Sequence, residues 1–253
     1  SDMCSSDLIN PEKRDDWSEV QNCVKAINTS IQELEKLPIS NRLIKKTHEI
    51  LLSGVRGKHK IPGEFRTSQN WIGATLKDAI FIPPHHSEVN GLMSDLEKFI
   101  NDEEHPVPHL IKIAIIHYQF ETIHPFLDGN GRLGRLLITL YLVSNNVLKK
   151  PSLYLSDFFE KNKGYYYDNL MTVRLTGNLT QWIKFFLVGV LETSKESIQV
   201  FKDIIALKTD IETNRLPKLG SKIEKGQQLI KQLFQVPITD AKQVAELLQV
   251  SPS

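Results

Sequence analysis

The sequence predicts an all-α protein that carries one β-hairpin. Apolar residues recur at three- and four-residue spacing over most of the 253 positions, which is the pattern of amphipathic helices. Between Phe65 and Ile82 the chain changes to two short β-prone pieces that flank a turn, and Pro83 and Pro84 end the second piece. The composition, 40% hydrophobic with two cysteines, is that of a globular chain from a reducing compartment.

The periodicity predicts a series of helices along the chain. They are expected at residues 16–34, 41–52, 88–101, 108–123, 133–147, 156–160, 165–174, 180–208, 224–234 and 240–248. The segments 108–123 and 133–147 are apolar on most sides, so the first is expected to be the buried central helix. The polar stretch 209–222, with Pro217 and Gly220, is expected to be a linker or a kinked helical joint.

The last two predicted helices are typical of the first part of a helix-turn-helix, with Ser251 placed to cap a third helix. We therefore expect a partial helix-turn-helix that ends before its recognition helix. The predicted organisation is N-terminal helices at 1–55, a core at 56–208 with a flap at about 65–84, and a linker with the partial helix-turn-helix at 209–253.

The charges nearly cancel. Lys and Arg number 31 against 30 Asp and Glu, which argues against capture of nucleic acid or an anionic membrane by the protein as a whole. No apolar run is long enough to cross a bilayer, and no signal segment opens the chain. We expect a soluble, cytoplasmic protein.

One segment concentrates chemically active groups: residues 124–135, His-Pro-Phe-Leu-Asp-Gly-Asn-Gly-Arg-Leu-Gly-Arg. It lies between two strongly apolar helical patterns, so it is expected to be a loop that leads into a helix N-terminus. Pro125 disfavours helix at His124, which puts the imidazole at the exit of the preceding helix. Gly129 and Gly131 permit positive φ and a close approach of backbone N–H groups to a ligand.

This segment suits a nucleotide phosphate. The unpaired N–H groups and the positive dipole end of the following helix attract anions, and Arg132 and Arg135 lie three residues apart on one face of that helix. Asp128 offers a hard carboxylate for Mg²⁺, which usually bridges a protein carboxylate and substrate phosphates. His124 offers a base that titrates near neutrality. Each residue alone would suit an ordinary loop, but the combination indicates transfer chemistry at a phosphate.

At these residues the sequence resembles the Fic family, whose signature His-Pro-Phe-x-Asp-Gly-Asn-Gly-Arg-x-x-Arg it matches throughout. Residues 63–73 and 82–84 resemble the family's flap region, and residues 153–156 and 165–167 resemble family sequence downstream. The tail is similar to the winged-helix tail of many bacterial members. The resemblance covers about residues 12–205 and implies a Fic-type helical bundle.

The resemblance implies a protein adenylyltransferase, which transfers AMP from ATP to a Ser, Thr or Tyr hydroxyl of a target protein and releases pyrophosphate. His124 would be the general base, and Asp128 would hold Mg²⁺ between the α- and β-phosphates. The Asn130 side chain would also bond the α-phosphate, and the two arginines would neutralise the outer phosphates. The implied ATP- and phosphate-binding set is Asp128, Gly129, Asn130, Gly131, Arg132, Leu133, Gly134 and Arg135.

The flap would align the target by main-chain pairing along its exposed edge, and it would overhang the nucleotide with Asp78, Ala79, Ile80 and Phe81. A hairpin that merely packs on the bundle is the alternative. Tyr166 resembles the aromatic residue on the adenosine side of the family's site, with a core tyrosine as the alternative. Phe126 is expected to be a core anchor, and Arg174 a solvated arginine on a helix face.

Many family members carry an inhibitory helix with the pattern Ser/Thr-x-x-x-Glu-Gly/Asn, whose glutamate pairs with the second arginine of the signature. The chain holds no full match, because Thr29-x-x-x-Glu33 is followed by Leu34. We expect the motif to lie before Ser1 in a longer parent, in which case Arg135 has no such partner here and this chain is the more active form.

Several alternatives stay open at this stage. A Fic fold can also remove AMP or transfer UMP, GMP or phosphocholine, because phosphate-binding residues do not identify the base. A regulator that binds DNA through its tail is favoured by Lys218, Lys222 and Lys225, and a tail that mediates dimerisation or target choice is a further alternative. The expected partners are ATP and a target protein, with self-modification and a homodimer as further candidates.

Overall fold

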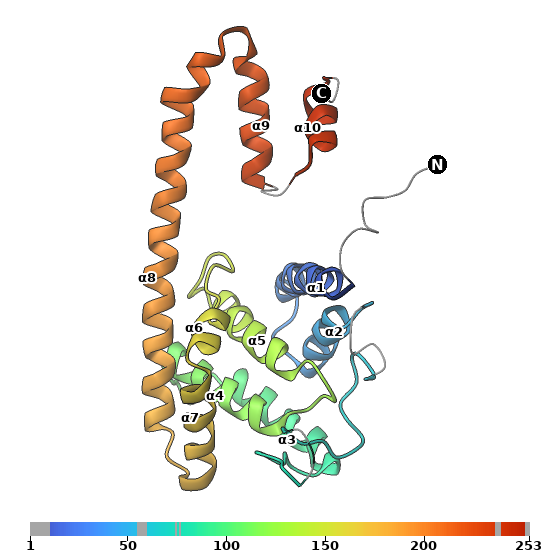
Figure 1. Ribbon diagram of the computed structural model, residues 1–253. Helices are drawn as coiled ribbons and strands as arrows, with labels where there is room; N and C mark the ends of the chain where they lie inside the picture. The colour runs from blue at the N-terminus through green and yellow to red at the C-terminus, as the bar shows by residue number, and fades with distance from the viewer. Residues whose placement is uncertain (1–10, 55–59, 74, 76, 236–238, 251–253) are drawn as a thin grey trace, which may run out of the picture. The chain divides into compact units, whose positions relative to one another are not determined.

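The computed structural model of the protein describes residues 11–54, 60–73, 75, 77–235 and 239–250 (Figure 1). The predicted fold class is confirmed, because helices account for most of the described residues. The helices are α1 (Pro11–Leu34), α2 (Asn41–Leu51), α3 (Val89–Ile100), α4 (His109–Ile123), α5 (Asn130–Ser144), α6 (Ser156–Lys161), α7 (Lys163–Thr176), α8 (Thr180–Asp210), α9 (Ile223–Gln235) and α10 (Ala241–Leu248), with a 3₁₀ turn at His86–Glu88.

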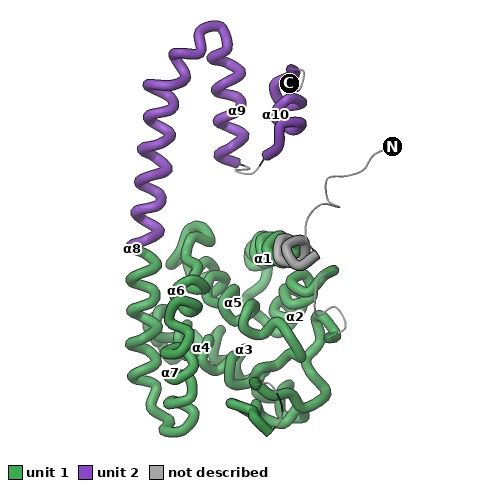
Figure 2. Tube along the Cα trace, in the orientation of Figure 1, with its two compact units in different colours: residues 1–194 green, residues 195–253 purple. Residues whose placement is uncertain are grey.

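The chain divides into two compact units, residues 1–194 and 195–253 (Figure 2). The predicted N-terminal helices therefore belong to the same unit as the core. The division falls inside α8, upstream of the expected boundary at residue 209. The reason is the distribution of buried side chains, since those on α8, from Trp182 to Thr193, all precede Ser194.

The centre of unit 1 is the helix pair α4 and α5. As expected for the central helix, α4 buries Ile113, Ile116 and Phe120 completely, and α5 buries nearly every residue from Leu133 to Leu142. α5 lies between α4 on one side and α1 and α2 on the other (Figure 1). α8 is joined to α4 by the Trp182 indole N–H, which donates to the Ala114 carbonyl at 2.8 Å.

The connection between α4 and α5 is short and tightly turned. α4 ends at Ile123 because His124 adopts a left-handed conformation, with φ 50° and ψ 60°, and Pro125 cannot continue the helix. α5 begins at Asn130, after Gly129 takes φ 77°. The signature loop, residues 124–129, is thus held between the two most buried helices of the unit.

The flap reverses direction as predicted, but its described residues pair at a single antiparallel bridge, between Ile72 and Phe81. The Ile72 N–H donates to the Phe81 carbonyl at 2.9 Å, and the Ile80 N–H donates to the Ile72 carbonyl at 2.8 Å. The expected hairpin is shorter than predicted because Pro83 and Pro84 cannot donate to a ladder, and the chain near Arg66 bonds to the signature loop instead.

In unit 2, α8 continues into a π-helical turn at Ile211–Arg215 and a 3₁₀ segment at Leu216–Lys222, which bends at Gly220 with φ 56°. The expectation of a kinked helical joint is confirmed. α10 begins with a capping box between Asp240 and Gln243. The predicted cap by Ser251 lies outside the described residues, so the helix-turn-helix stays a prediction.

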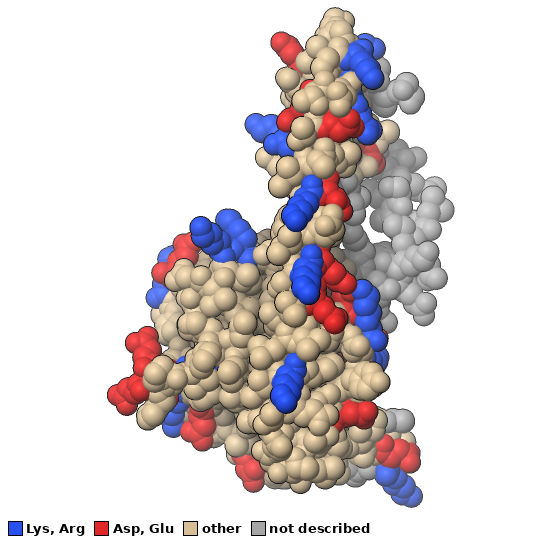
Figure 3. Space-filling model, turned by 90° about the vertical axis from the view of Figure 1, so that its left-hand side faces the viewer, with Lys and Arg blue, Asp and Glu red and all other residues tan. Residues whose placement is uncertain are grey.

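No helix in the described part of the chain has the length and apolar character needed to cross a membrane. On the face drawn in Figure 3, Lys and Arg lie among Asp and Glu over both units, in keeping with the balanced composition.

Candidate active site

His124 lies at the exit of α4, where the sequence puts it. Its N–H donates to the Phe120 carbonyl at 2.9 Å, which closes the last turn of the helix. The imidazole is largely buried, and its Nδ1 atom has no hydrogen-bond partner within the described residues. A ring nitrogen that no protein group occupies can accept a proton.

The pKa of His124 is lowered from 6.5 to about 4, chiefly by burial and to a smaller extent by the positive charges of Arg66 and Arg174. The Glu121 carbonyl and the Asp128 carboxylate act in the opposite direction. His124 is therefore neutral at pH 7 in the free protein. A neutral imidazole can accept a proton, whereas the protonated form cannot.

Arg66 holds the backbone at this point, a feature that the sequence analysis missed. Its guanidinium donates to the carbonyls of His124 at 3.0 Å, Ile123 at 3.4 Å, Pro84 at 2.5 Å and Ser68 at 3.3 Å, although the side chain is only 2% exposed. The only signal in the sequence is that Arg66 lies inside the segment that resembles the flap, and this does not reveal which groups the side chain contacts.

The floor of the signature loop is built by His48 of α2, which the sequence analysis also missed. Its ring stacks on Phe126 with centroids 3.7 Å apart, which confirms Phe126 as a core anchor. Its Nδ1 accepts the Gly63 N–H at 2.9 Å, so the neutral ring carries its proton on Nε2 and donates to the Asp128 carbonyl, also at 2.9 Å. Gly129 is needed here, because a Cβ would lie 3.3 Å from His48 Nε2.

The Asn130 side chain shapes the loop. Its Oδ1 accepts the Phe126 N–H at 2.9 Å, and its Nδ2 donates to the Phe126 carbonyl at 2.8 Å. Both polar atoms are thus committed inside a side chain that is 2% exposed. The Nδ2 atom has a second N–H group, so the expected bond from this amide to an α-phosphate stays a prediction.

The first turn of α5 presents backbone N–H groups, as the anion-site hypothesis requires. The N–H groups of Asn130, Gly131 and Arg132 precede the first intrahelical bond, which Leu133 donates to the Gly129 carbonyl at 3.0 Å. Leu133 therefore uses its N–H in the helix and buries its side chain. Its expected place among the phosphate-binding residues stays a prediction.

Gly134 is also turned away from the anion site. Its carbonyl accepts from His117 Nδ1 at 3.1 Å, and a Cβ on Gly134 would collide with the Glu121 carboxylate. Gly134 therefore makes room for a buried acid beneath α5. Burial raises the pKa of Glu121 to about 7, against the opposing charges of Arg135 and Arg174.

The structure brings the three charged residues of the signature together. Asp128 Oδ1 accepts the Gly129 N–H at 2.6 Å and lies 3.8 Å from Arg132 Nη2. Arg135 reaches back over the first turn of α5, where a Cβ on Gly131 would lie 3.2 Å from its Nη1. Gly131 therefore leaves the space that this arginine occupies.

Arg132 has a further partner that the sequence analysis did not find. Its Nη1 lies 3.0 Å from Glu19 Oε2 of α1, and both side chains are about one quarter exposed. This ion pair joins the first helix of the chain to the candidate phosphate site.

The flap residues take different environments. Asp78 is exposed and accepts from the Thr75 hydroxyl at 2.7 Å, Ala79 is partly buried, and Ile80 is 66% exposed. The Phe81 ring packs 3.5 Å from the guanidinium carbon of Arg174. Arg174 is thus a partly buried link between α7 and the flap, which corrects the expectation of a solvated arginine.

Tyr166 lies in the core, which was the alternative to a nucleotide contact. It is 5% exposed, and its hydroxyl hydrogen bonds to His117 Nε2 at 3.0 Å. Its ring packs among Phe159, Tyr167 and Trp182, which supports the core alternative, and the expected contact with adenosine stays a prediction.

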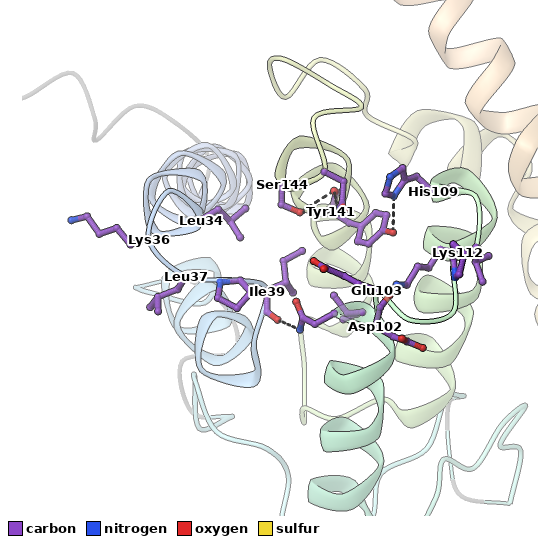
Figure 4. Close-up of a pocket in the computed structure, with 16 residues that line it drawn as sticks. Leu34, Lys36, Leu37, Ile39, Asp102, Glu103, His109, Lys112, Tyr141 and Ser144 are labelled. Atoms are coloured by element: carbon purple, nitrogen blue, oxygen red, sulfur yellow. Dashed lines mark hydrogen bonds between the residues drawn. The ribbon is translucent and has the colours of Figure 1, made fainter.

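A cavity of about 780 Å³ lies at the other ends of α4 and α5 (Figure 4). Its wall includes His109, which hydrogen bonds to the Tyr141 hydroxyl at 3.0 Å, and Lys112, which donates to the Asp102 carbonyl at 2.7 Å. Since His109 opens α4 and Tyr141 lies in the last turns of α5, this cavity is separate from the signature loop.

Comparison with known proteins finds a family match over the region that holds the site. Residues 38–142 match the Fic/DOC family. The "Protein adenylyltransferase Fic" of Drosophila grimshawi is 35% identical over 124 residues, and that of Drosophila willistoni is 27% identical over 213 residues. These alignments cover 47% and 82% of this chain, which spans only 23% and 37% of the lengths of the two relatives.

Solved structures agree on the fold. A Fic family protein from Desulfovibrio desulfuricans G20 superposes with a TM-score of 0.62 at 25% identity, over 96% of this chain and 65% of that chain. Fic-1 from C. elegans gives a TM-score of 0.60 at 22% identity, over 79% of this chain and 56% of that chain. Residues 38–142, which include the signature loop between α4 and α5, match the Fic/DOC family, and the fold is similar to those of these two Fic structures.

Proposed function

We propose that the protein is an adenylyltransferase that moves AMP from ATP to a hydroxyl group of a target protein. The observation that carries the proposal is a neutral, partly buried His124 at a turn whose next residues supply a carboxylate, a helix N-terminus and two arginines. The relatives named protein adenylyltransferase support the same reaction.

In this reaction His124 accepts the proton of the target hydroxyl while the oxygen attacks the α-phosphorus of ATP. A new P–O bond forms to the target, and the bond between the α-phosphorus and the bridging oxygen breaks, so that pyrophosphate leaves. The barrier is lowered chiefly by positioning and by charge stabilisation, because phosphoryl centres need little covalent assistance.

The first turn of α5 supplies the charge stabilisation. The N–H groups of Asn130, Gly131 and Arg132 and the positive end of the helix dipole would face the phosphates. The Arg132 and Arg135 guanidiniums would bind the outer phosphates and the leaving pyrophosphate. Arg132 would exchange its contact with Glu19 for one with the nucleotide.

Asp128 fits the role of the protein ligand to Mg²⁺. Its carboxylate is 43% exposed and adjoins the candidate phosphate site. Among the described residues, no three or more Asp, Glu, His or Cys side chains lie together as a set of metal ligands. Mg²⁺ is commonly held by one or two carboxylates together with substrate phosphates. When bound, the ion would offset the negative charge of the phosphates beside Asp128.

The flap is the proposed docking edge for the target. Trp71, Ile80 and Ile82 expose apolar side chains there, at 42%, 66% and 52% exposure. An extended peptide could add to the edge next to the Ile72–Phe81 bridge by main-chain hydrogen bonds, which align a hydroxyl with little demand on sequence.

The test incubates the protein with Mg²⁺ and α-labelled ATP, alone and with a cell lysate. We expect labelled protein and an intact-mass gain of one adenylyl group, both lost in His124→Ala. His105→Ala, which removes an exposed histidine paired with Asp102, is the matched control and should keep full activity.

Parallel reactions test the alternatives. Equal labelling by UTP, GTP or a phosphocholine donor would show that ATP is not the preferred donor. Loss of AMP from a pre-modified target would show that the protein removes AMP and does not add it. No label from ATP in the wild-type protein, with ATP binding intact, would refute adenylyl transfer.

A further inference from the structure

We propose that Arg66 is a positioning residue that fixes the general base His124 relative to the flap. This inference rests on the proposed function for its catalytic meaning, but the contact itself can be tested without activity. The assignment stands on geometry, because one buried guanidinium joins the exit of α4 to both ends of the flap.

The guanidinium bonds to three separate pieces of chain. It donates to His124 and Ile123 at the exit of α4, to Ser68 near the start of the flap and to Pro84 at its end. The Arg66 main-chain N–H adds a bond of 2.8 Å to the Pro125 carbonyl. The two flap ends therefore cannot shift relative to His124 without breaking bonds to this side chain.

Electrostatics explains why a buried arginine is stable here. The four acceptors of its guanidinium are all carbonyl oxygens, and two of them belong to the negative end of α4. A planar guanidinium can address several acceptors at fixed angles, whereas a lysine amine is a single point charge. Lysine at this position could keep the charge but not the whole set of bonds.

Arg66 donates to no residue between 128 and 135, all of which the structure describes. Its loss should therefore leave Mg·ATP binding largely intact while the base and the docked hydroxyl lose their alignment. This separation of effects distinguishes positioning from a contribution to nucleotide binding.

The activity test compares Arg66→Met, Arg66→Lys and a matched control, Lys112→Met. Lys112 is also a buried cation that donates to a carbonyl, but it lies near the other end of α4. We expect kcat to fall about 100-fold in Arg66→Met and at least about tenfold in Arg66→Lys. The Kd for Mg·ATP should change less than about threefold in both, and Lys112→Met should keep its kcat.

The second test observes His124 by NMR in histidine-labelled protein, with its signal assigned by its loss in His124→Ala. His124 faces Arg66 from the flap base, Arg174 from α7, Asp128 from the loop and the Glu121 carbonyl from α4. Removing the Arg66 charge should raise the His124 pKa from about 4 in Arg66→Met, while Arg66→Lys should leave it low.

The outcomes separate the two proposals. A wild-type protein that transfers nothing refutes the proposed function, and the NMR arm then decides the Arg66 contact alone. If Arg66→Met does not fold, Arg66→Lys decides: full kcat in that variant overturns the inference. Lost Mg·ATP binding with unchanged kcat, an unmoved His124 titration in folded Arg66→Met, or an equal loss of kcat in Lys112→Met would also overturn it.

Discussion

Burial gives two side chains at the end of α4, Glu121 and His124, protonation states that they would not have in water. The pKa of the acid is raised to about 7 and that of the base is lowered to about 4. In both cases burial is the largest cause, because it disfavours whichever form carries charge. The base is ready to accept a proton, and the acid is half protonated near neutrality.

The pH profile of adenylyl transfer should reflect the low pKa of His124. We expect kcat/KM to stay level from about pH 8 down to about pH 5.5 and to fall only as the pH approaches 4, because a histidine of ordinary pKa would already be half protonated at 6.5. The measurement is initial rate against pH at low ATP. A fall centred near 6.5 would contradict it.

Glu121→Gln should stabilise the protein at high pH. Below pH 4.5 the carboxyl is protonated in both the folded and the unfolded chain, so it has no effect on stability. Between 4.5 and about 7 only the unfolded chain loses its proton, so stability falls as pH rises, by about 3 kcal/mol in all. Urea unfolding at pH 4.5 and pH 8 measures the difference in the free energy of unfolding between Glu121→Gln and the unsubstituted protein. The control is Glu192→Gln, which changes an exposed residue. No gain at pH 8 would sink this prediction.

At the scale of helices, the start of α5 and the side of α1 share one arginine. Glu19 and Arg132 form an ion pair at 3.0 Å, and the same guanidinium is a candidate ligand for phosphate. The two interactions compete, since one guanidinium cannot satisfy both partners fully. α1 is thereby part of the candidate site, although it precedes the region that matches the Fic/DOC family.

Glu19→Gln should therefore tighten Mg·ATP binding. Release of a partly exposed ion pair worth about 1 kcal/mol corresponds to about a fivefold lower Kd. Calorimetric titration with Mg·ATP measures the change. Glu33→Gln, which removes the pair between α1 and Lys46 of α2, is the matched control and should leave the Kd unchanged. Weaker binding in Glu19→Gln would instead show that Glu19 holds Arg132 in its binding position.

The flap shows how tertiary contacts limit a local pattern. The β-prone pieces around Ile72 and Phe81 do meet, but only at one bridge. Arg66 and Asn70 direct their hydrogen bonds to the signature loop, at Pro125 and Phe126, in place of a longer ladder. Alternation of residue types signals extended chain, and it carries no information about which partner the backbone will choose.

For the molecule as a whole, every proposed site residue lies in unit 1. A chain that ends at Ser194 should fold and bind Mg·ATP, because the buried residues of α8 end at Thr193. We expect its melting temperature to lie within about 4 °C of the full chain, which corresponds to about 1 kcal/mol. A thermal melt followed by circular dichroism, together with the Mg·ATP Kd, tests this. Loss of the fold would show that unit 2 stabilises unit 1.

Unit 2 carries the second functional hypothesis. Its α9 and α10 are helical as predicted, and α10 has a complete N-terminal capping box. We propose that binding of a partner or DNA by unit 2 is a second function, beside the reaction at the site in unit 1. Salt-dependent binding of duplex DNA would support the DNA hypothesis, and no binding at low salt would count against it.

The sequence by itself determined the helical class, most helix limits to within a few residues, and the signature of residues 124–135 with its base, carboxylate and arginines. These depend on local spacing, backbone freedom and residue type, which can be seen within a short window. Only the tertiary structure identified the residues that hold this segment in place. Arg66 donates to the His124 carbonyl, His48 hydrogen bonds to the Asp128 carbonyl, and Glu19 forms an ion pair with Arg132. It also showed that Asn130 and Tyr166 are buried and hydrogen bonded within the protein, because burial and long-range pairing depend on segments far apart in the chain.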